Sequence, residues 1–225
     1  MCLTGETFKA RPMKTLLIYS PKGGSGKSTL ARNLAVAAAL DGVAVATLDT
    51  DPQKSLSEWW DRRDAARPAI QHFVVPIAEI TGPPEPIGGV DLLIIDTPTA
   101  VEVFPQAMKT LLLAADMILV PAKATTDDVT STERAMRFAR GFGRPAAFVL
   151  NQGKPRVLEV RDARRRLAGV AEVCPVDIPD LTEFFRSAAH GLGVLELSDS
   201  RSAPDVAALW RFAASRLGLA VAEAA

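Results

Sequence analysis

The chain has 225 residues, 48% of them hydrophobic, and its 26 basic side chains balance its 26 acidic ones. This composition predicts a folded domain with a substantial core and excludes an intrinsically disordered chain. Cys2 and Cys174 are too few for a disulfide framework, and no apolar run is long enough to cross a bilayer. We therefore expect a protein of a reducing compartment, the cytoplasm.

Strand and helix patterns alternate along the chain. Short apolar segments predict strands at residues 15–19, 43–48, 71–75, 91–95, 117–120, 146–150 and 170–175. Helix-forming segments predict helices at residues 28–40, 55–66, 103–114, 126–141, 157–167, 181–190 and 203–217. This alternation predicts an α/β fold with a mostly parallel, twisted sheet and helices on both faces.

One domain accounts for this pattern, at residues 14–217. Residues 1–13 carry no structural pattern and are expected to form an N-terminal tail, and residues 218–225 a C-terminal tail. No internal repeat and no second domain is visible in the sequence.

Aromatic residues on two predicted helices indicate which faces are buried. Four side chains of the helix at 126–141 recur at helical spacing and predict a core-facing stripe: Ala135, Phe138, Ala139 and Phe142. On the helix at 55–66 we expect Trp60 to pack on the core and Trp59 to be half-exposed at an interface.

A glycine-rich segment, residues 21–28, follows the first predicted strand and opens the first predicted helix. A helix N-terminus binds anions because its free N–H groups and its dipole point the same way. Three glycines let the backbone approach phosphate oxygens: Gly23, Gly24 and Gly26. Lys27 would reach the β- and γ-phosphates, and the Ser28 hydroxyl would ligate Mg²⁺. We therefore predict a phosphate-binding loop for ATP and Mg²⁺, in an enzyme that transfers a phosphoryl group to water.

This loop departs from the usual pattern of Gly, four residues and Gly-Lys-Ser/Thr. Pro21 stands at the first glycine position, and Lys22 adds a second lysine. Residues 22–28 therefore resemble the deviant Walker A motif of the ParA/MinD ATPases. The resemblance continues through Leu-Asp-Thr-Asp-Pro-Gln at 48–53, Ile-Ile-Asp-Thr-Pro at 94–98 and Leu-Val-Pro at 119–121. It covers most of the predicted domain and is strongest to small ParA proteins of plasmid segregation.

The resemblance implies a nucleotide site completed by a second subunit. Lys22 would reach across a homodimer interface to the partner's nucleotide, so that ATP rather than ADP supports the dimer. The nucleotide-binding residues implied are Lys22, Gly23, Gly24, Ser25, Gly26, Lys27, Ser28, Thr29, Asn151, Pro179 and Asp180. The last three would flank adenine, although an ordinary turn role remains open for each of them.

Carboxylates follow two predicted strands, at the edge where parallel α/β sheets bind ligands. Asp49 and Asp51 follow the second predicted strand, and Asp96 follows the strand at 91–95. By resemblance Asp51 orients the attacking water, whereas a helix-capping role is the alternative for Asp49 or Asp51. The catalytic residues implied are Lys22, Lys27 and Asp51, and the metal ligands are Ser28, Asp49 and Asp96.

Charge is distributed unevenly although the net charge is zero. Residues 134–166 hold ten basic side chains and two acidic ones, which predicts a basic face for a polyanion. ParA-type proteins bind DNA without sequence preference in the ATP-bound state. The candidate DNA-binding residues are Arg156, Arg161, Arg164, Arg165, Arg166 and Arg186, with a solvated helix face as the alternative.

Together these features predict an ATPase switch that partitions or positions a DNA or protein cargo over the nucleoid. A small adaptor or centromere-binding protein would stimulate its slow hydrolysis. A MinD-like membrane-cycling protein is one alternative, but residues 217–225 lack the Lys and Arg of a basic amphipathic helix, so we expect no membrane partner. An ATP-dependent biosynthetic enzyme that uses the same loop is the other.

Overall fold

The computed structural model describes residues 12–99, 101–153 and 157–221. Its strands are β1 (Lys14–Ile18), β2 (Val45–Asp49), β3 (Ile70–Val74), β4 (Leu92–Asp96), β5 (Met117–Ala122), β6 (Ala146–Gly153), β7 (Glu172–Val173) and β8 (Ile178–Pro179). Its α-helices are α1 (Lys27–Leu40), α2 (Ser55–Asp61), α3 (Pro105–Ala114), α4 (Thr126–Arg140), α5 (Leu158–Ala168), α6 (Glu183–Ala189) and α7 (Ala203–Leu217). The 3₁₀ helices are η1 (Ile77–Glu79), η2 (Val101–Val103) and η3 (Val194–Glu196).

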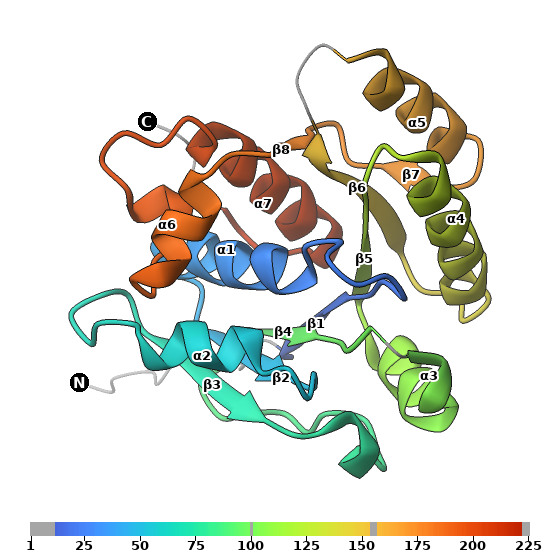
Figure 1. The fold of residues 1–225 in the computed structure, drawn as a ribbon. Helices are drawn as coiled ribbons and strands as arrows, with labels where there is room; N and C mark the ends of the chain where they lie inside the picture. The colour runs from blue at the N-terminus through green and yellow to red at the C-terminus, as the bar shows by residue number, and fades with distance from the viewer. Residues whose placement is uncertain (1–11, 100, 154–156, 222–225) are drawn as a thin grey trace, which may run out of the picture.

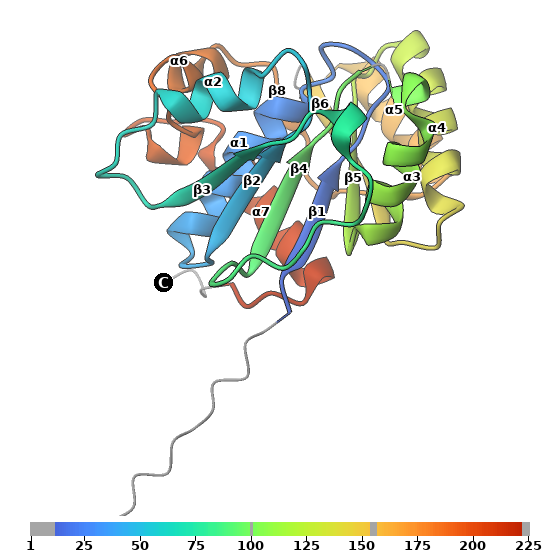
Figure 2. The ribbon, with the colours of Figure 1, turned by 90° about the horizontal axis from the view of Figure 1, so that it is seen from below.

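The strands form one parallel sheet in the order β3-β2-β4-β1-β5-β6-β7. Strand β8 lies off this path and pairs with the last residues of β6, after the part of β6 that pairs with β7. Helices α1 and α7 pack together on one face, with α2 and α6 beside α1 (Figure 1). Helices α3, α4 and α5 cover the other face (Figure 2). The predicted single α/β domain with a parallel sheet is therefore confirmed.

Strand β1 divides the core between the two faces because successive side chains of a strand point to opposite sides. Leu16 and Ile18 belong to the cluster under α1 and α7, which includes Trp210. Leu17 and the following Tyr19 belong to the cluster under α3 and α4. All four are at most 4% exposed, which explains why the central strands read as continuous apolar runs.

Some element boundaries differ from those predicted. The helix expected at 55–66 ends at Asp61, and the chain turns there so that Arg63 reaches back into the protein. The strand expected at 170–175 is reduced to β7, and the short β8 was missed. The pairing of β7 with β6 stops at this point because Pro175, which follows Cys174, has no N–H to donate to a neighbouring strand.

The prediction for the two adjacent tryptophans is wrong for Trp59, whereas Trp60 packs against the core as expected. Trp59 is fully buried, and its Nε1 donates to the carbonyl of Leu192 at 3.1 Å. Trp60 is only partly buried; it stacks on His72 at a ring-centroid distance of 5.3 Å and donates to the carbonyl of Ile70. Trp59 is therefore not available to an interface.

The predicted apolar stripe of α4 is wrong at one position. Ala135 and Ala139 are buried, but Phe138 is 50% exposed. Its ring contacts Phe142 edge-on, at a centroid distance of 5.2 Å. The contact joins the two rings at the surface, so Phe138 does not fill the core.

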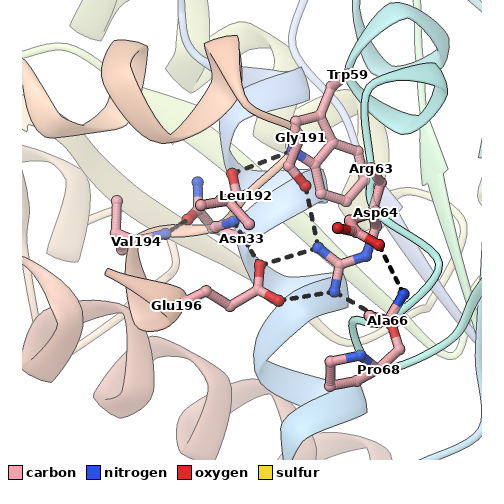
Figure 3. A network of polar contacts seen from close by, with 11 residues as sticks. Asn33, Trp59, Arg63, Asp64, Ala66, Pro68, Gly191, Leu192, Val194 and Glu196 are labelled. Carbon is pink, nitrogen blue, oxygen red and sulfur yellow. Dashed lines mark hydrogen bonds and ion pairs between the residues drawn. The ribbon is translucent and has the colours of Figure 1, made fainter. Parts of the chain in front are cut away.

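A buried ion pair connects the chain after α2 to the segment after α6 (Figure 3). Both terminal nitrogens of Arg63 donate to the carboxylate of Glu196 at 2.9 Å, and the two side chains are 5% and 2% exposed. Arg63 also donates to the carbonyls of Pro68 and Gly191. Glu196 in turn accepts from the N–H of Gly193. These contacts pair the two opposite charges where water is excluded, and they leave only Nε of Arg63 without a partner among the described residues.

The same network reaches the first helix of the fold. The Asn33 side chain of α1 accepts from the N–H of Val194 at 2.9 Å (Figure 3). Its amide nitrogen also donates to the carbonyl of Thr29 at 2.8 Å. One continuous set of polar contacts therefore links the end of α2, the start of η3 and the first turn of α1. That turn follows the glycine-rich loop directly.

We expect Arg63→Met to lower the free energy of unfolding by about 3–5 kcal/mol, because Glu196 would remain buried without its partner. Urea unfolding monitored by circular dichroism measures the change. Arg67→Met is the matched control, since Arg67 is exposed and its side chain makes no hydrogen bond or ion pair within the described residues. Equal stability of the two variants would contradict this assignment.

Candidate functional site

Strand register brings the predicted loop and carboxylates to one edge of the sheet. Ile18 at the end of β1 pairs with Asp96 at the end of β4, and Asp96 pairs with Asp49 at the end of β2. The glycine-rich loop begins just after Ile18 and the Asp51 segment just after Asp49. Residues separated by more than 70 positions therefore surround one site at the carboxyl ends of neighbouring strands.

The glycine-rich loop requires left-handed backbone at two positions. Gly24 has φ +67° and Gly26 has φ +92°. A Cβ atom on Gly26 would lie only 2.0 Å from Nδ2 of Asn151, so a side chain is excluded there by space as well as by conformation. Helix α1 begins at Lys27 without a side-chain cap on its first N–H groups. Those groups are available to an anion.

A cavity of about 830 Å³ opens beside this loop, within the size range of nucleotide and cofactor sites. It brings together many of the predicted nucleotide and catalytic residues: Gly23, Gly24, Gly26, Lys27, Ser28, Thr29 and Asp51. Thr99, which follows β4, also lines this cavity.

Lys27 is the buried cation of the loop. The residue is 6% exposed, and its Nζ donates to the carbonyl of Lys22 at 3.4 Å. Burial lowers the pKa of Lys27, and the carboxylates of Asp96 and Asp51 oppose that shift. The single contact with a neutral carbonyl leaves most of the donor capacity of Lys27 for an anion in the cavity.

Asp96 is fully buried, and no other residue that the structure describes makes a hydrogen bond to either of its carboxylate oxygens. Burial raises its pKa from 3.8 to about 7, against the opposing influence of the Ser28 hydroxyl and the Lys27 charge. An unpartnered buried carboxylate next to a hydroxyl fits Mg²⁺, a hard cation that takes oxygen ligands. Ser28 and Asp96 therefore fit the predicted metal site.

Asp49 lies beside this site, but its oxygens have protein partners. Oδ2 accepts from the N–H of Ser57 at 2.9 Å and from its hydroxyl at 2.7 Å, and Oδ1 accepts from the N–H of Asp51 at 3.0 Å. These contacts hold α2 and the Asp51 segment, as in the capping alternative. The Asp51 side chain accepts from the N–H of Gln53 at 2.9 Å and lines the cavity.

Lys22 points toward α4 of its own chain. Its Nζ lies 3.9 Å from a carboxylate oxygen of Asp128, with the lysine side chain 37% exposed and the aspartate 12% exposed. At this distance and exposure the pair is weak. Lys22 is therefore held only loosely in its present position.

Asn151 and Gln152, at the end of β6, brace the glycine-rich loop. Asn151 donates to the carbonyl of Ser25 at 2.7 Å, and Gln152 donates to the carbonyl of Gly24 at 3.3 Å. Gln152 has φ +56°, which is uncommon for a residue other than glycine. The role of Asn151 at adenine stays a prediction; in the structure its amide contacts the loop.

Pro179 and Asp180 lie farther from the loop. Pro179 lines a separate cavity of about 560 Å³ with Gly153 and residues of α5, and the N–H of Asp180 donates to the carbonyl of Gly153. Neither residue lines the cavity beside the glycine-rich loop. Their proposed contact with adenine remains untested.

Most of the predicted DNA-binding arginines of α5 are paired with acidic residues. Arg164 pairs with Asp177, Arg165 with Asp162 and Arg166 with Glu133. Arg161 and Arg186 are exposed and make no ion pair with any other residue that the structure describes. Arg156 lies outside the described residues.

Sequence reasoning missed two arginines, Arg32 and Arg62, that line the same cavity as the loop. Arg32 is 8% exposed, on a helix that is otherwise nearly all apolar after its first turn. A lone arginine in that setting was a visible signal. Arg62 has no such signal in the sequence, because its position depends on where α2 ends.

The fold agrees with comparisons to known proteins. Residues 16–194 match the CobQ/CobB/MinD/ParA nucleotide binding domain. The chain belongs to this family, which confirms the resemblance of the loop. It is therefore a nucleotide-binding domain of the ParA/MinD ATPase type.

Two named relatives and one solved structure illustrate the similarity. Maintenance of carboxysome distribution protein A from Gloeobacter kilaueensis is 32% identical over 68% of this chain and 70% of its own. Protein virC1 from Rhizobium radiobacter is 28% identical over 73% of this chain and 74% of its own. The McdA(D38A)–ATP complex from Cyanothece matches with a TM-score of 0.70 and 19% identity, over 93% of this chain and 98% of its own.

No helix within residues 12–99, 101–153 and 157–221 has the length and apolar character needed to cross a membrane.

The raised pKa of Asp96 predicts a pH dependence of stability without nucleotide or metal. Between about pH 4 and 7 the folded state holds a proton that the unfolded state has released. Stability therefore falls with rising pH, by about 1.4 kcal/mol per pH unit from this group. Urea unfolding should show Asp96→Asn becoming progressively more stable than the parent protein over this range. Parallel pH profiles for the two proteins would show that Asp96 is not the group responsible.

Proposed function

We propose that this chain is an ATP-gated switch that hydrolyses ATP, dimerises in the ATP state and positions a cargo over the nucleoid in the cytoplasm. The observation that carries the proposal is the unpartnered carboxylate of Asp96, buried at the base of the glycine-rich loop near Lys27 and Ser28. Such a carboxylate is costly unless a cation binds it. Membership of the nucleotide-binding family and the ATP-bound McdA relative support ATP as the ligand.

The N–H groups of the loop and of the first turn of α1 would hold the phosphates, and Lys27 would offset their charge. Mg²⁺, held by Ser28 and Asp96, would neutralise negative charge on the β- and γ-phosphates. Asp51 is the carboxylate that lines the cavity, so we assign to it the orientation of the attacking water. Asp49 accepts from the N–H of Asp51 and would thereby position that residue. Asp49 lies beside Asp96 in the sheet, so it would support the metal site without contacting the ion directly.

Dimerisation would use Lys22. Its weak pairing with Asp128 costs little to break, and its side chain is already partly in solvent. In the dimer Lys22 would contact the nucleotide of the partner subunit, so that the γ-phosphate stabilises the assembly. Asn151, Pro179 and Asp180 would flank adenine after the nucleotide has displaced the contact between Asn151 and Ser25.

Non-specific DNA binding would begin with the exposed arginines that lack an acidic partner in the described part of the chain, Arg161 and Arg186. Arg156 is proposed with them on sequence grounds. Arg164, Arg165 and Arg166 would have to exchange their ion pairs for contacts with DNA phosphates. Arg165 and Arg166 are exposed and can do so at a small cost in free energy. The relative named for carboxysome distribution supports a positioning role, with a small partner protein as the adaptor that stimulates hydrolysis.

Two substitutions test the assigned chemistry. Lys27→Ala should abolish nucleotide binding. Asp51→Ala should bind ATP as the parent protein does and release phosphate about 10²- to 10⁴-fold more slowly, because a group that positions or activates water is lost. Phosphate release and nucleotide titration measure both effects. Glu58→Ala, at an exposed carboxylate of α2, is the control and should behave as the parent protein. Hydrolysis at the parental rate by Asp51→Ala would show that another group orients the water.

DNA binding is tested by titrating duplex DNA with ATP, with ADP and without nucleotide, at two salt concentrations. We expect binding only with ATP, weakening as salt rises because each phosphate contact releases counterions. Arg161→Ala and Arg186→Ala should each weaken binding and reduce the salt dependence. Arg216→Ala is the control, since Arg216 lies on α7, which packs on the opposite face of the sheet from α5. Equal binding in every nucleotide state, or none, excludes a DNA-borne switch.

A further inference from the structure

Arg32 occupies the wall of the nucleotide cavity one helical turn beyond Ser28. Residues four apart lie on the same face of a helix, so Arg32 follows Ser28 toward the cavity, which both residues line. Arg32 is 8% exposed, and its Nη2 donates to the carbonyl of Phe184 at 3.0 Å and to the hydroxyl of Thr29 at 3.3 Å. Its buried Nε has no hydrogen-bond partner within the described residues.

A second guanidinium lies on the same wall. Arg62, just after α2, lines the cavity, and its Nε donates to the carbonyl of Ala188 in α6 at 3.3 Å. Within the residues that the structure describes, neither Arg32 nor Arg62 makes an ion pair. Two positively charged side chains therefore line one cavity, and each donates a hydrogen bond to a carbonyl of α6.

The charge of Arg32 is poorly compensated in this position. Burial lowers the pKa of Arg32 to about 10; the Asp96 carboxylate opposes the shift and the Arg62 charge adds to it. A buried guanidinium is stable when an anion neutralises it and takes up its remaining donors. The carbonyls of Phe184 and Ala188 accept hydrogen bonds but carry no net charge. An anion bound between Arg32 and Arg62 would supply the negative charge that these neutral carbonyls lack.

We propose that Arg32 and Arg62 form a second phosphate-binding subsite, which contacts the α-phosphate of the nucleotide in this cavity. The inference rests on the proposed function, because it takes ATP as the ligand. Lys27 and Ser28 serve the β- and γ-phosphate end, and Arg32 lies a turn farther along α1, in contact with Thr29. A phosphate common to ATP and ADP would thus bind to residues that do not sense the γ-phosphate.

The subsite would separate two tasks within one cavity. Lys27, Ser28 and Lys22 would distinguish ATP from ADP, whereas the arginine pair would retain either nucleotide. The Arg32 and Arg62 hydrogen bonds to α6 would also connect bound nucleotide to that helix, on which the exposed Arg186 lies. Nucleotide binding and the position of Arg186 would then be coupled through the same contacts.

The test is the affinity of Mg²⁺-ATP and Mg²⁺-ADP for a set of variants, measured by displacement of a fluorescent nucleotide. Arg32→Met should weaken both nucleotides by the same factor, about 10- to 100-fold, as expected for loss of a hydrogen bond to a charged group. Arg62→Met, at the more exposed position, should weaken both by about threefold to tenfold. Arg67→Met, an exposed arginine that does not line the cavity, should have no effect.

Two further substitutions distinguish a charge contact from a structural role. Arg32→Gln keeps a donor for the Phe184 carbonyl but removes the charge, whereas Arg32→Lys keeps the charge. The proposal predicts higher affinity for Arg32→Lys than for Arg32→Gln, and less salt dependence of binding for Arg32→Gln than for the parent protein. Equal affinities for these two variants would mean that Arg32 only holds α6, and would overturn the proposal.

Other outcomes also overturn it. Parental affinity of Arg32→Met for both nucleotides excludes the subsite, and a loss confined to ATP would place Arg32 at the γ-phosphate. Parental nucleotide affinity with weakened DNA binding would assign the arginine pair to nucleic acid. Failure of the proposed function is recognised separately, because the parent protein would then bind neither nucleotide and Lys27→Ala would change nothing.

Discussion

The burial of one carboxylate without a partner is the constraint around which the site is built. Asp96 ends a central strand whose neighbours on both sides are also buried, so water cannot solvate it. Lys27 and Ser28 lie next to it, yet within the described part of the chain both oxygens lack a hydrogen bond. The fold keeps this arrangement because the strand register fixes Asp96 opposite Ile18 and Asp49. A bound cation would neutralise this carboxylate and take up its oxygens.

The loop above Asp96 is held from several directions. The side chains of Asn151 and Gln152, at the end of β6, donate hydrogen bonds to it. Gly26 allows Asn151 to lie closer to the loop backbone than any side chain at position 26 would permit. On the other side, Asn33 and the Arg63–Glu196 pair connect the first turn of α1 with the ends of α2 and α6. These contacts come from elements far apart in the chain. A rigid frame therefore surrounds a cavity whose charged groups are unevenly compensated, and this favours tight binding of a polyanion.

Much of the site could be predicted because its chemistry is local. A glycine-rich loop between a strand and a helix, and carboxylates that directly follow apolar strands, are visible as short patterns. Contacts between distant segments were not visible. The burial of Trp59 depends on where α2 ends. Helix α2 ends just before Arg63, which turns toward Glu196, 133 positions later in the chain. The ion pairs of Arg164 and Arg166 depend in the same way on residues of other elements.

The sequence by itself determined the α/β class, the phosphate loop and the carboxylates at the sheet edge, because strand periodicity and backbone freedom at glycine are properties of short segments. Only the tertiary structure decided which side chains meet. It paired Oδ2 of Asp49 with Ser57 of α2, placed Asn151 against Ser25 and brought Arg32 and Arg62 to the lining of one cavity. Burial and pairing of charge are set by the packing of distant elements, and no local pattern records them.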